Sequence, residues 1–232
     1  MKYACFVAAG AALVVSSGAS ASVRITEFMS EGQGLTGPGT GANRQREFFE
    51  ITNLGTAAVN VAGWSYNDNN VNDPNSWGDS IGSIAAGESI VFTQMSVADF
   101  RSYWNLSAAV RIVSYGQLSN LGNADTINIY NSVTQNAGTL VDSLTYTADA
   151  RGSGVSRNRP FDGGTGQFAN SAWVDSFVGD AFGSILAPNP IFPAGPEYID
   201  LANPGRYVPT PGTAALLGAA AIFAMPSRRR RL

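Results

Sequence analysis

Apolar and polar residues alternate with a period of two along much of the chain between residues 23 and 147. This alternation predicts β-strands, because successive side chains of a strand point to opposite faces of a sheet. The segments that follow the pattern are residues 23–29, 47–53, 58–66, 81–84, 89–94, 109–113, 126–130 and 139–147. Many short strands separated by glycine-containing turns favour a β-sandwich or barrel over an α/β fold.

One short helix is predicted within this β pattern. Ser96 can cap its N-terminus, and Asp99 stands at the capping-box position three residues later. Val97, Phe100 and Trp104 follow at a spacing that places them on one face of the helix.

Several stretches combine these predicted strands with turn residues in a recurring order: VRITEF at 23–28, EFFEITNLG at 47–55, VNVAGWSY at 59–66, IAAGESIV at 84–91, LSNLGN at 118–123 and VDSLTY at 141–146. Their order resembles the lamin tail domain, an immunoglobulin-like β-sandwich. The resemblance implies a scaffold that exported bacterial proteins use for binding or display. We therefore expect an all-β, immunoglobulin-like sandwich with one short helix, flanked by hydrophobic sorting segments at both ends.

The N-terminal residues have the features of a secretory signal peptide. Lys2 gives a basic start, Ala4–Val15 is an apolar run, and Ala19 and Ala21 form an A-x-A cleavage site. The run is too short to span a bilayer core of about 30 Å permanently. We expect Sec-type export and cleavage after Ala21; the alternative is a buried N-terminal helix of a cytosolic protein.

The C-terminal end has three parts: a proline-rich motif, an apolar run from Thr213 to Met225, and an arginine cluster. Prolines keep a peptide extended and accessible to a protease. The apolar run can enter a membrane only marginally, and the arginines favour the cytoplasmic side. The residues expected to carry the signal are Pro209, Thr210, Pro211, Gly212, Arg228, Arg229, Arg230 and Arg231.

This arrangement resembles the PEP-CTERM signal, which exosortase-type transpeptidases read in Gram-negative-type bacteria. The resemblance covers Val208 to Leu232, and the motif here is Pro-Thr-Pro, without the glutamate that names the family. It implies an exosortase-like enzyme as a partner. It also implies a location at the cell envelope, the surface or the extracellular matrix, with at least transient membrane attachment through the tail. A plain tail anchor or an amphipathic end is the alternative.

The expected domain organisation follows from these segments. Residues 1–21 are the signal peptide, residues 22–147 the sandwich and residues 208–232 the sorting segment. Residues 148–207 are rich in Gly, Asn and Pro, and we expect them to lie along the sandwich or to form a stalk.

Composition removes most catalytic chemistry from the exported chain. The sequence has no His, and its one Cys and one Lys, Cys5 and Lys2, lie in the leader. The usual general base, a thiol nucleophile, a Schiff-base amine and soft metal ligands are therefore lacking. Of the 14 basic residues, Lys2 and Arg228–Arg231 lie at the ends, which leaves nine Arg against 17 Asp plus Glu. Nucleic-acid binding is not expected from such a surface.

Two carboxylates, Glu27 and Glu50, lie on predicted strands that can be neighbours. A glycosidase needs such a pair roughly 5–10 Å apart; the alternative is that they are rim charges or turn acceptors on an antiparallel sheet. Asp142 shares a strand face with Leu144 and Tyr146. A buried strand Asp needs partners, and we expect it to accept backbone N–H bonds at a bulge.

One loop carries the candidate metal ligands. The spacing of oxygen-bearing side chains loosely copies a calcium-binding loop, although Asp73 takes the position of the required glycine and Pro74 follows. The candidate calcium ligands are Asp68, Asn70, Asn72 and Asp79. The alternative is a solvated loop of Asx turns, and no other cofactor is expected.

Trp77 lies in the same polar loop and is the tryptophan expected to be exposed, where it could contact a polysaccharide. Arg157 and Arg159 are expected at the surface. The sequence therefore predicts an exported, envelope-associated, non-enzymatic structural, adhesion or display protein. The alternatives are an extracellular polysaccharide- or calcium-binding module and, more remotely, a hydrolase.

Overall fold

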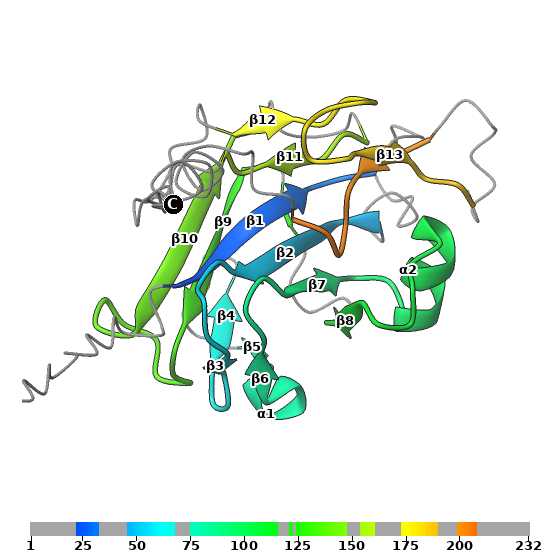
Figure 1. Cartoon of the computed structure of the whole chain (residues 1–232). Coiled ribbons are helices and arrows are strands. Elements are labelled where there is room, and N and C mark those ends of the chain that lie inside the picture. Colours follow the sequence, from blue (N-terminus) through cyan, green and yellow to red (C-terminus); the bar gives the residue numbers. More distant parts are fainter. Residues whose placement is uncertain are drawn as a thin grey trace, which may run out of the picture.

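Two packed β-sheets form the body of the molecule (Figure 1). The computed structural model describes residues 22–32, 46–67, 75–115, 121–122, 124–147, 154–160, 173–189 and 199–207. The larger sheet has six strands in the order β12-β11-β1-β2-β7-β8, antiparallel except for the parallel pair β7–β8. Its strands are β1 (Val23–Met29), β2 (Phe48–Asn53), β7 (Ser89–Thr93), β8 (Arg111–Ser114), β11 (Arg157–Asn158) and β12 (Val174–Asp175).

The smaller sheet has four strands in the order β10-β9-β4-β5. They are β4 (Ser65–Asn67), β5 (Asn75–Ser76), β9 (Asp125–Tyr130) and β10 (Leu140–Tyr146). Two short pairs complete the strands: β3 (Val59–Asn60) with β6 (Ser83–Ile84), and β13 (Ile185–Leu186) with β14 (Leu201–Ala202). The predicted strand at 58–66 is divided because Gly63, at a φ of 74°, turns the chain between β3 and β4.

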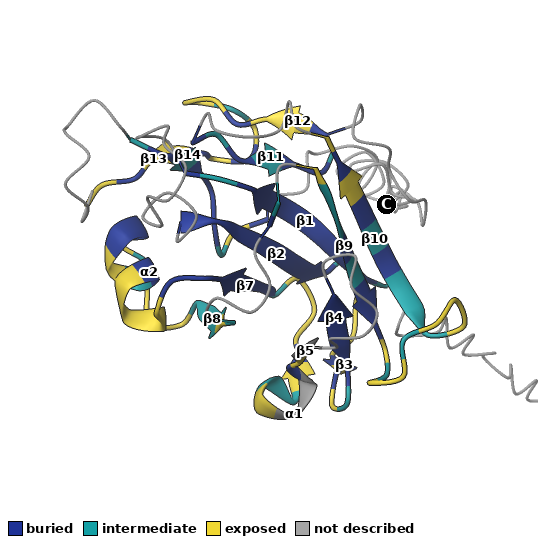
Figure 2. Cartoon of the chain, turned by 180° about the vertical axis from the view of Figure 1, so that it is seen from behind, coloured by how far each residue is buried: buried dark blue, intermediate teal, exposed yellow. Residues whose placement is uncertain are grey.

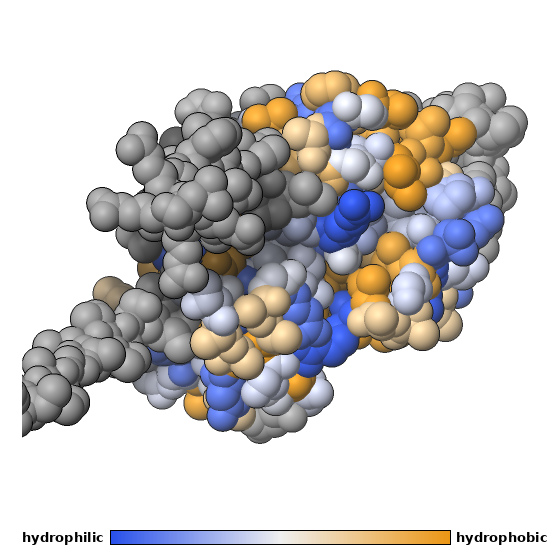
Figure 3. All heavy atoms as spheres, in the orientation of Figure 1, coloured by the Kyte–Doolittle hydropathy of each residue, from blue (hydrophilic) through white to orange (hydrophobic). Residues whose placement is uncertain are grey.

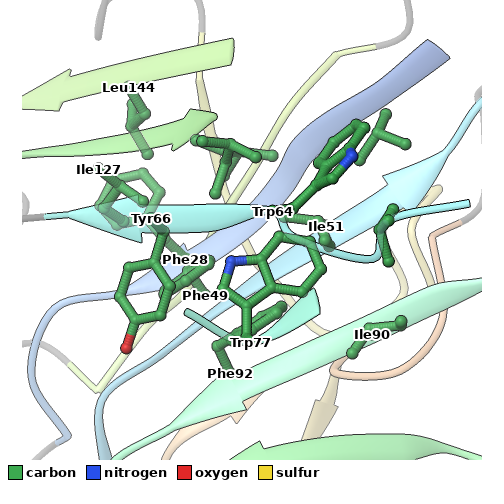
Figure 4. Packing of buried hydrophobic residues seen from close by; sticks show 14 of the residues in the cluster. Phe28, Phe49, Ile51, Trp64, Tyr66, Trp77, Ile90, Phe92, Ile127 and Leu144 are labelled. Atoms are coloured by element: carbon green, nitrogen blue, oxygen red, sulfur yellow. The ribbon is translucent and has the colours of Figure 1, made fainter. Parts of the chain in front are cut away.

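The main core lies between the two sheets (Figure 4). Alternate residues of β2, Phe49 and Ile51, point into it, as the period of two predicts. Phe49 stacks on Phe92 of β7 with ring centroids 4.7 Å apart, and Ile127 and Leu144 close the core from the other sheet. This packing confirms the predicted all-β sandwich.

A second cluster lies on the other face of the six-stranded sheet, which we call the outer face. There Phe48 packs against helix α2 (Val97–Trp104). Ser96 caps α2 as predicted, since its hydroxyl accepts the Asp99 N–H at 3.1 Å. The predicted apolar face was wrong in one residue: Val97 is exposed, and Tyr103 is buried beside Phe100 and Trp104 instead. A single helical turn, α1 (Gly78–Ile81), also forms in the loop before β6.

The six-stranded sheet takes strands from both sides of residue 147. β11 pairs with β1 and carries β12 at its other edge, so segments far apart in sequence lie side by side at the top of Figure 1. Residues 199–207, which we call the strap, lie over the outer face and contact β1, β2 and β7. Of the described residues of 148–207, β11 and β12 therefore belong to the six-stranded sheet and the strap lies along it, where the sequence left open a position along the sandwich or a stalk.

The predicted sorting segments, 1–21 with Ala19 and Ala21 and 208–232 with Pro209 and Arg228, lie outside the described residues. Within the described residues, no helix has the length and apolar character needed to cross a membrane.

Candidate functional site

Glu27 and Glu50 lie next to each other at the middle of the outer face, and neither side chain is exposed to solvent. They are register partners across β1 and β2 because a bulge between Ile25 and Glu27 adds one residue to β1. Partners in an antiparallel pair project from the same face of a sheet. The alternative that they are rim charges is wrong, because the strap covers this face; they accept N–H groups at the turn of the strap, as the other alternative has it. Figure 2 shows β1 and β2 buried along their length.

Glu50 binds the strap directly and β1 through a hydroxyl. Its Oε2 accepts the Gly205 N–H at 2.7 Å, and its Oε1 accepts the Thr26 hydroxyl at 2.8 Å. The hydroxyl contacts continue from Thr26 to Thr52 at 2.8 Å and from Thr52 to Ser89 at 2.7 Å. A row of polar contacts therefore crosses β1, β2 and β7 beneath the strap.

Glu27 binds the strap and the segment before β11. Its Oε1 accepts the Asn203 N–H at 2.9 Å and the Ser156 hydroxyl at 2.5 Å. Ser156 in turn contacts Ser176 at 2.7 Å, and Ser176 accepts the side-chain amide of Asn158 at 2.8 Å. Among the described residues, Glu27 Oε2 and Asn158 Oδ1 are buried without a hydrogen-bond partner, and the two residues face each other in the β1–β11 register.

Burial of these two carboxyl groups favours their neutral forms. It raises the pKa of Glu50 to about 7, although the Thr26 hydroxyl and the Gly205 N–H act in the opposite direction. Burial also raises the pKa of Glu27 well above its usual range, and the neighbouring charge of Glu50 raises it further. Burial and the repulsion between the two carboxylates therefore both favour protonation of the pair.

Asp142 forms a buried ion pair with Arg159, with 2.6 Å between the carboxylate and guanidinium atoms. It also accepts the Ile25 N–H at 2.8 Å beside the bulge of β1, which is the role its position predicted. Burial raises the pKa of Asp142, and the charge of Arg159 offsets part of this effect. The surface position expected for Arg159 is wrong: it is 4% exposed, whereas Arg157 is partly exposed and pairs with Asp175.

The strap is bound at both of its ends. Near its start, Asp200 accepts the Tyr103 hydroxyl of α2 at 2.9 Å and lies 3.4 Å from the Arg46 guanidinium. Burial and the charge of Asp200 raise the pKa of Tyr103 to about 12, so this hydroxyl stays protonated. At its end, the Tyr207 hydroxyl donates to the Arg159 carbonyl oxygen at 3.2 Å.

The predicted calcium loop is not tested by this geometry. Asp68, Asn70 and Asn72 lie outside the described residues, and so does the side chain of Asp79, whose backbone belongs to α1. In the part of the chain that is described, no three His, Cys, Asp or Glu residues cluster closely enough to hold a metal ion. The calcium site stays a prediction, and a melting-temperature shift on adding calcium tests it.

Trp77 belongs to the core and not to the surface. Its side chain is 4% exposed, and its ring lies 5.1 Å from that of Phe92 and 6.0 Å from that of Trp64 (Figure 4). The exposed tryptophan expected for polysaccharide binding is therefore wrong, because the ring of Trp77 packs inward against Trp64 and Phe92.

The protein is therefore a β-sandwich in which two buried carboxyl groups, those of Glu27 and Glu50, accept hydrogen bonds from the strap of the same chain. The family model of the lamin tail domain matches residues 16–148. This match spans more than half of the chain, so the protein belongs to the lamin tail domain family and its sandwich is immunoglobulin-like. No curated protein matches the chain. The strap lies beyond the matched residues.

Proposed function

We propose that the protein is exported and acts at the cell envelope as a non-enzymatic structural, adhesion or display domain. The lamin tail domain is a structural, immunoglobulin-like domain, which is compatible with this role. One observation carries the non-enzymatic part of the proposal. The candidate catalytic groups, Glu27 and Glu50, are wholly buried and accept hydrogen bonds from the strap.

Hydrolysis is poorly supported by this arrangement. A glycosidase places its two carboxyl groups on either side of a bound substrate. Here the strap backbone occupies the corresponding space, because the N–H groups of Asn203 and Gly205 lie 2.9 and 2.7 Å from the carboxyl oxygens. A substrate would have to displace a segment that is bound at both ends.

The chain ends support the proposed location. Residues 1–21 are the basis for export by Sec-type machinery, and residues 208–232 for recognition by an exosortase-like enzyme and for membrane contact. An extracellular polysaccharide is a further candidate partner in such a location, but Trp77 does not contribute to its binding because it is buried.

Cell fractionation of the full chain tests the location. Changing Arg228–Arg231 to Ser should reduce retention in the envelope and processing of the tail, because the positive charge favouring the cytoplasmic side is lost. Arg206→Ser is the matched control, since Arg206 is an exposed arginine of the folded part. If the tail variant localises and is processed like the control, the sorting interpretation is wrong.

A further inference from the structure

Five large apolar side chains form an exposed group on β12, the following turn and β13. They are Val174, Phe177, Val178, Ile185 and Leu186, with exposed fractions of 39%, 58%, 66%, 49% and 48%. Figure 3 shows apolar atoms gathered along this upper edge of the molecule. Only two other large apolar residues of the described chain are exposed, Val97 and Val133, and neither belongs to this group. Such clustering, unlike single exposed apolar residues, points to a contact surface.

The acidic groups between these apolar residues are already partnered. Asp175 forms an ion pair with Arg157 at 2.7 Å. Asp180 accepts the N–H groups of Phe177, Phe182 and Ser184 at 3.1, 3.0 and 2.9 Å. If this edge enters an apolar phase, Asp175 therefore keeps its ion pair and Asp180 keeps its hydrogen bonds.

The chain leaves the described fold beside this group. Tyr207, the last described residue, donates its hydroxyl to the carbonyl of Arg159 at 3.2 Å, and the preceding Asn158 is the register partner of Val174. The six residue steps from Tyr207 to Thr213 span at most about 21 Å, because an extended chain rises about 3.5 Å per residue. The apolar run that begins at Thr213 therefore starts no farther than this from Tyr207.

We propose that the exposed group Val174–Leu186 is a membrane-contact patch, which enters the interface of the bilayer to which the tail tethers the domain. The inference rests on the proposed function, because it needs the tail at the membrane. As a helix, the run from Thr213 to Met225 is about 20 Å long, shorter than the bilayer core of about 30 Å. A second apolar contact strengthens such a marginal attachment and orients the domain with β12 and β13 toward the lipid.

A single fluorescent label tests the patch in the full chain. Cys5→Ser removes the one native thiol, and Phe177→Cys then gives one site for a polarity-sensitive dye. The probe membrane is a vesicle of phosphatidylcholine and phosphatidylethanolamine. Val133→Cys is the matched control, because Val133 is 53% exposed in the β9–β10 loop, away from β12 and β13 in Figure 1. We expect the emission at position 177 to brighten and move to shorter wavelength on vesicle binding, with no change at position 133.

A second variant measures the same contact without a dye. Phe177→Ser combined with Val178→Ser should weaken vesicle binding about tenfold or more, because each side chain loses its transfer from water. Val133→Ser should have no effect. Both sites are exposed, so neither change disturbs the core.

The ways in which the proposal can fail are distinguishable. If the chain floats with vesicles but the labels at positions 177 and 133 respond alike, the patch is overturned while the tail proposal stands. If the chain does not associate with vesicles at all, both the patch and membrane attachment through the tail are refuted. If the label at position 177 responds to protein concentration without vesicles, a second copy of the chain covers the patch, and membrane contact is refuted.

Discussion

Replacing Glu50 by Gln should change how the stability of the protein depends on pH. The Glu50→Gln substitution keeps the size of the side chain and removes the charge that folding would have to bury. The new amide could donate toward the Thr26 hydroxyl and its oxygen could accept the Gly205 N–H, the partners of the two shortest contacts of Glu50 in the structure. The variant therefore resembles the wild-type protein with Glu50 protonated.

The size of the effect follows from the two pKa values. Glu50 has a pKa of about 7 in the folded protein against 4.5 for an ordinary Glu. The folded state therefore binds this proton more tightly than the unfolded state does. Its stabilising contribution is complete below pH 4.5 and is lost as the pH rises through about 7. The difference corresponds to about 3 kcal/mol, because one pH unit is worth about 1.4 kcal/mol.

Urea unfolding of both proteins between about pH 4 and about pH 9 measures this contribution. We expect the free energy of unfolding of the wild type to fall by about 3 kcal/mol across the window from Glu50 alone. The variant should lack this part of the slope and be the more stable protein at the alkaline end. A slope of the same sign should persist in the variant, because burial also raises the pKa of Glu27. Glu31→Gln, at a partly exposed position, is the control.

Two results would refute the reasoning. A wild-type stability that is flat across this window would mean that Glu50 does not change its proton affinity on folding. A variant that is less stable than the wild type at both ends would mean that the strap needs an ionised carboxylate.

Three substitutions test the remaining contacts by chemical denaturation. Arg159→Met should lower the free energy of unfolding by about 3–5 kcal/mol, because it leaves Asp142 buried without its charge partner. Adding Asp142→Leu should restore a large part of this stability. No recovery would mean that Arg159 acts mainly through other contacts. Gly205→Ala should cost about 2 kcal/mol or more, because its φ is +79° and the new Cβ would lie 2.5 Å from Val110; an unchanged midpoint would mean that the strap shifts freely. Trp77→Ala should cost about 3–5 kcal/mol if the ring is core, and less than about 0.5 kcal/mol if it is an exposed platform.

β1, β2, β7, β9 and β10 were predictable because alternate residues of each lie in the inter-sheet core, whereas β11 to β14 were not predicted. β1 spans residues 23–29 as predicted, and Phe49 and Ile51 alternate into the core with polar neighbours between them. Local pattern is sufficient where burial repeats every second residue. It was insufficient for Val97, since the helical spacing places both Val97 and Tyr103 near the core-facing side and only packing chooses between them.

The buried carboxylates could not be recognised from local pattern. Glu50 sits between Phe49 and Ile51, so alternation assigns it to the solvent face of the sandwich. That face is covered by a strap whose donor to Glu50 is the Gly205 backbone N–H, a group that every residue except proline carries. One signal was available: Phe48 and Glu50 share the outer face, and the buried Phe48 shows that this face is not simply solvated.

Arg159 was misplaced for a related reason. Its partner Asp142 lies on β10, and only the folded sheet brings the two together beside the bulge of β1. In the sequence, partners were expected for Asp142, which is correct. None was expected for Arg159, which was placed at the surface. A search for an opposite charge to match each predicted buried charge would have raised Arg159 as a candidate.

Intact mass spectrometry of the protein recovered from its native host, combined with cell fractionation, tests the proposed function most directly. We predict a chain that begins at Ser22, recovered in the envelope fraction, with the tail either cut near Pro209–Gly212 or embedded in the membrane. A cytosolic protein that retains residues 1–21 and 208–232 would contradict export, sorting and membrane contact together.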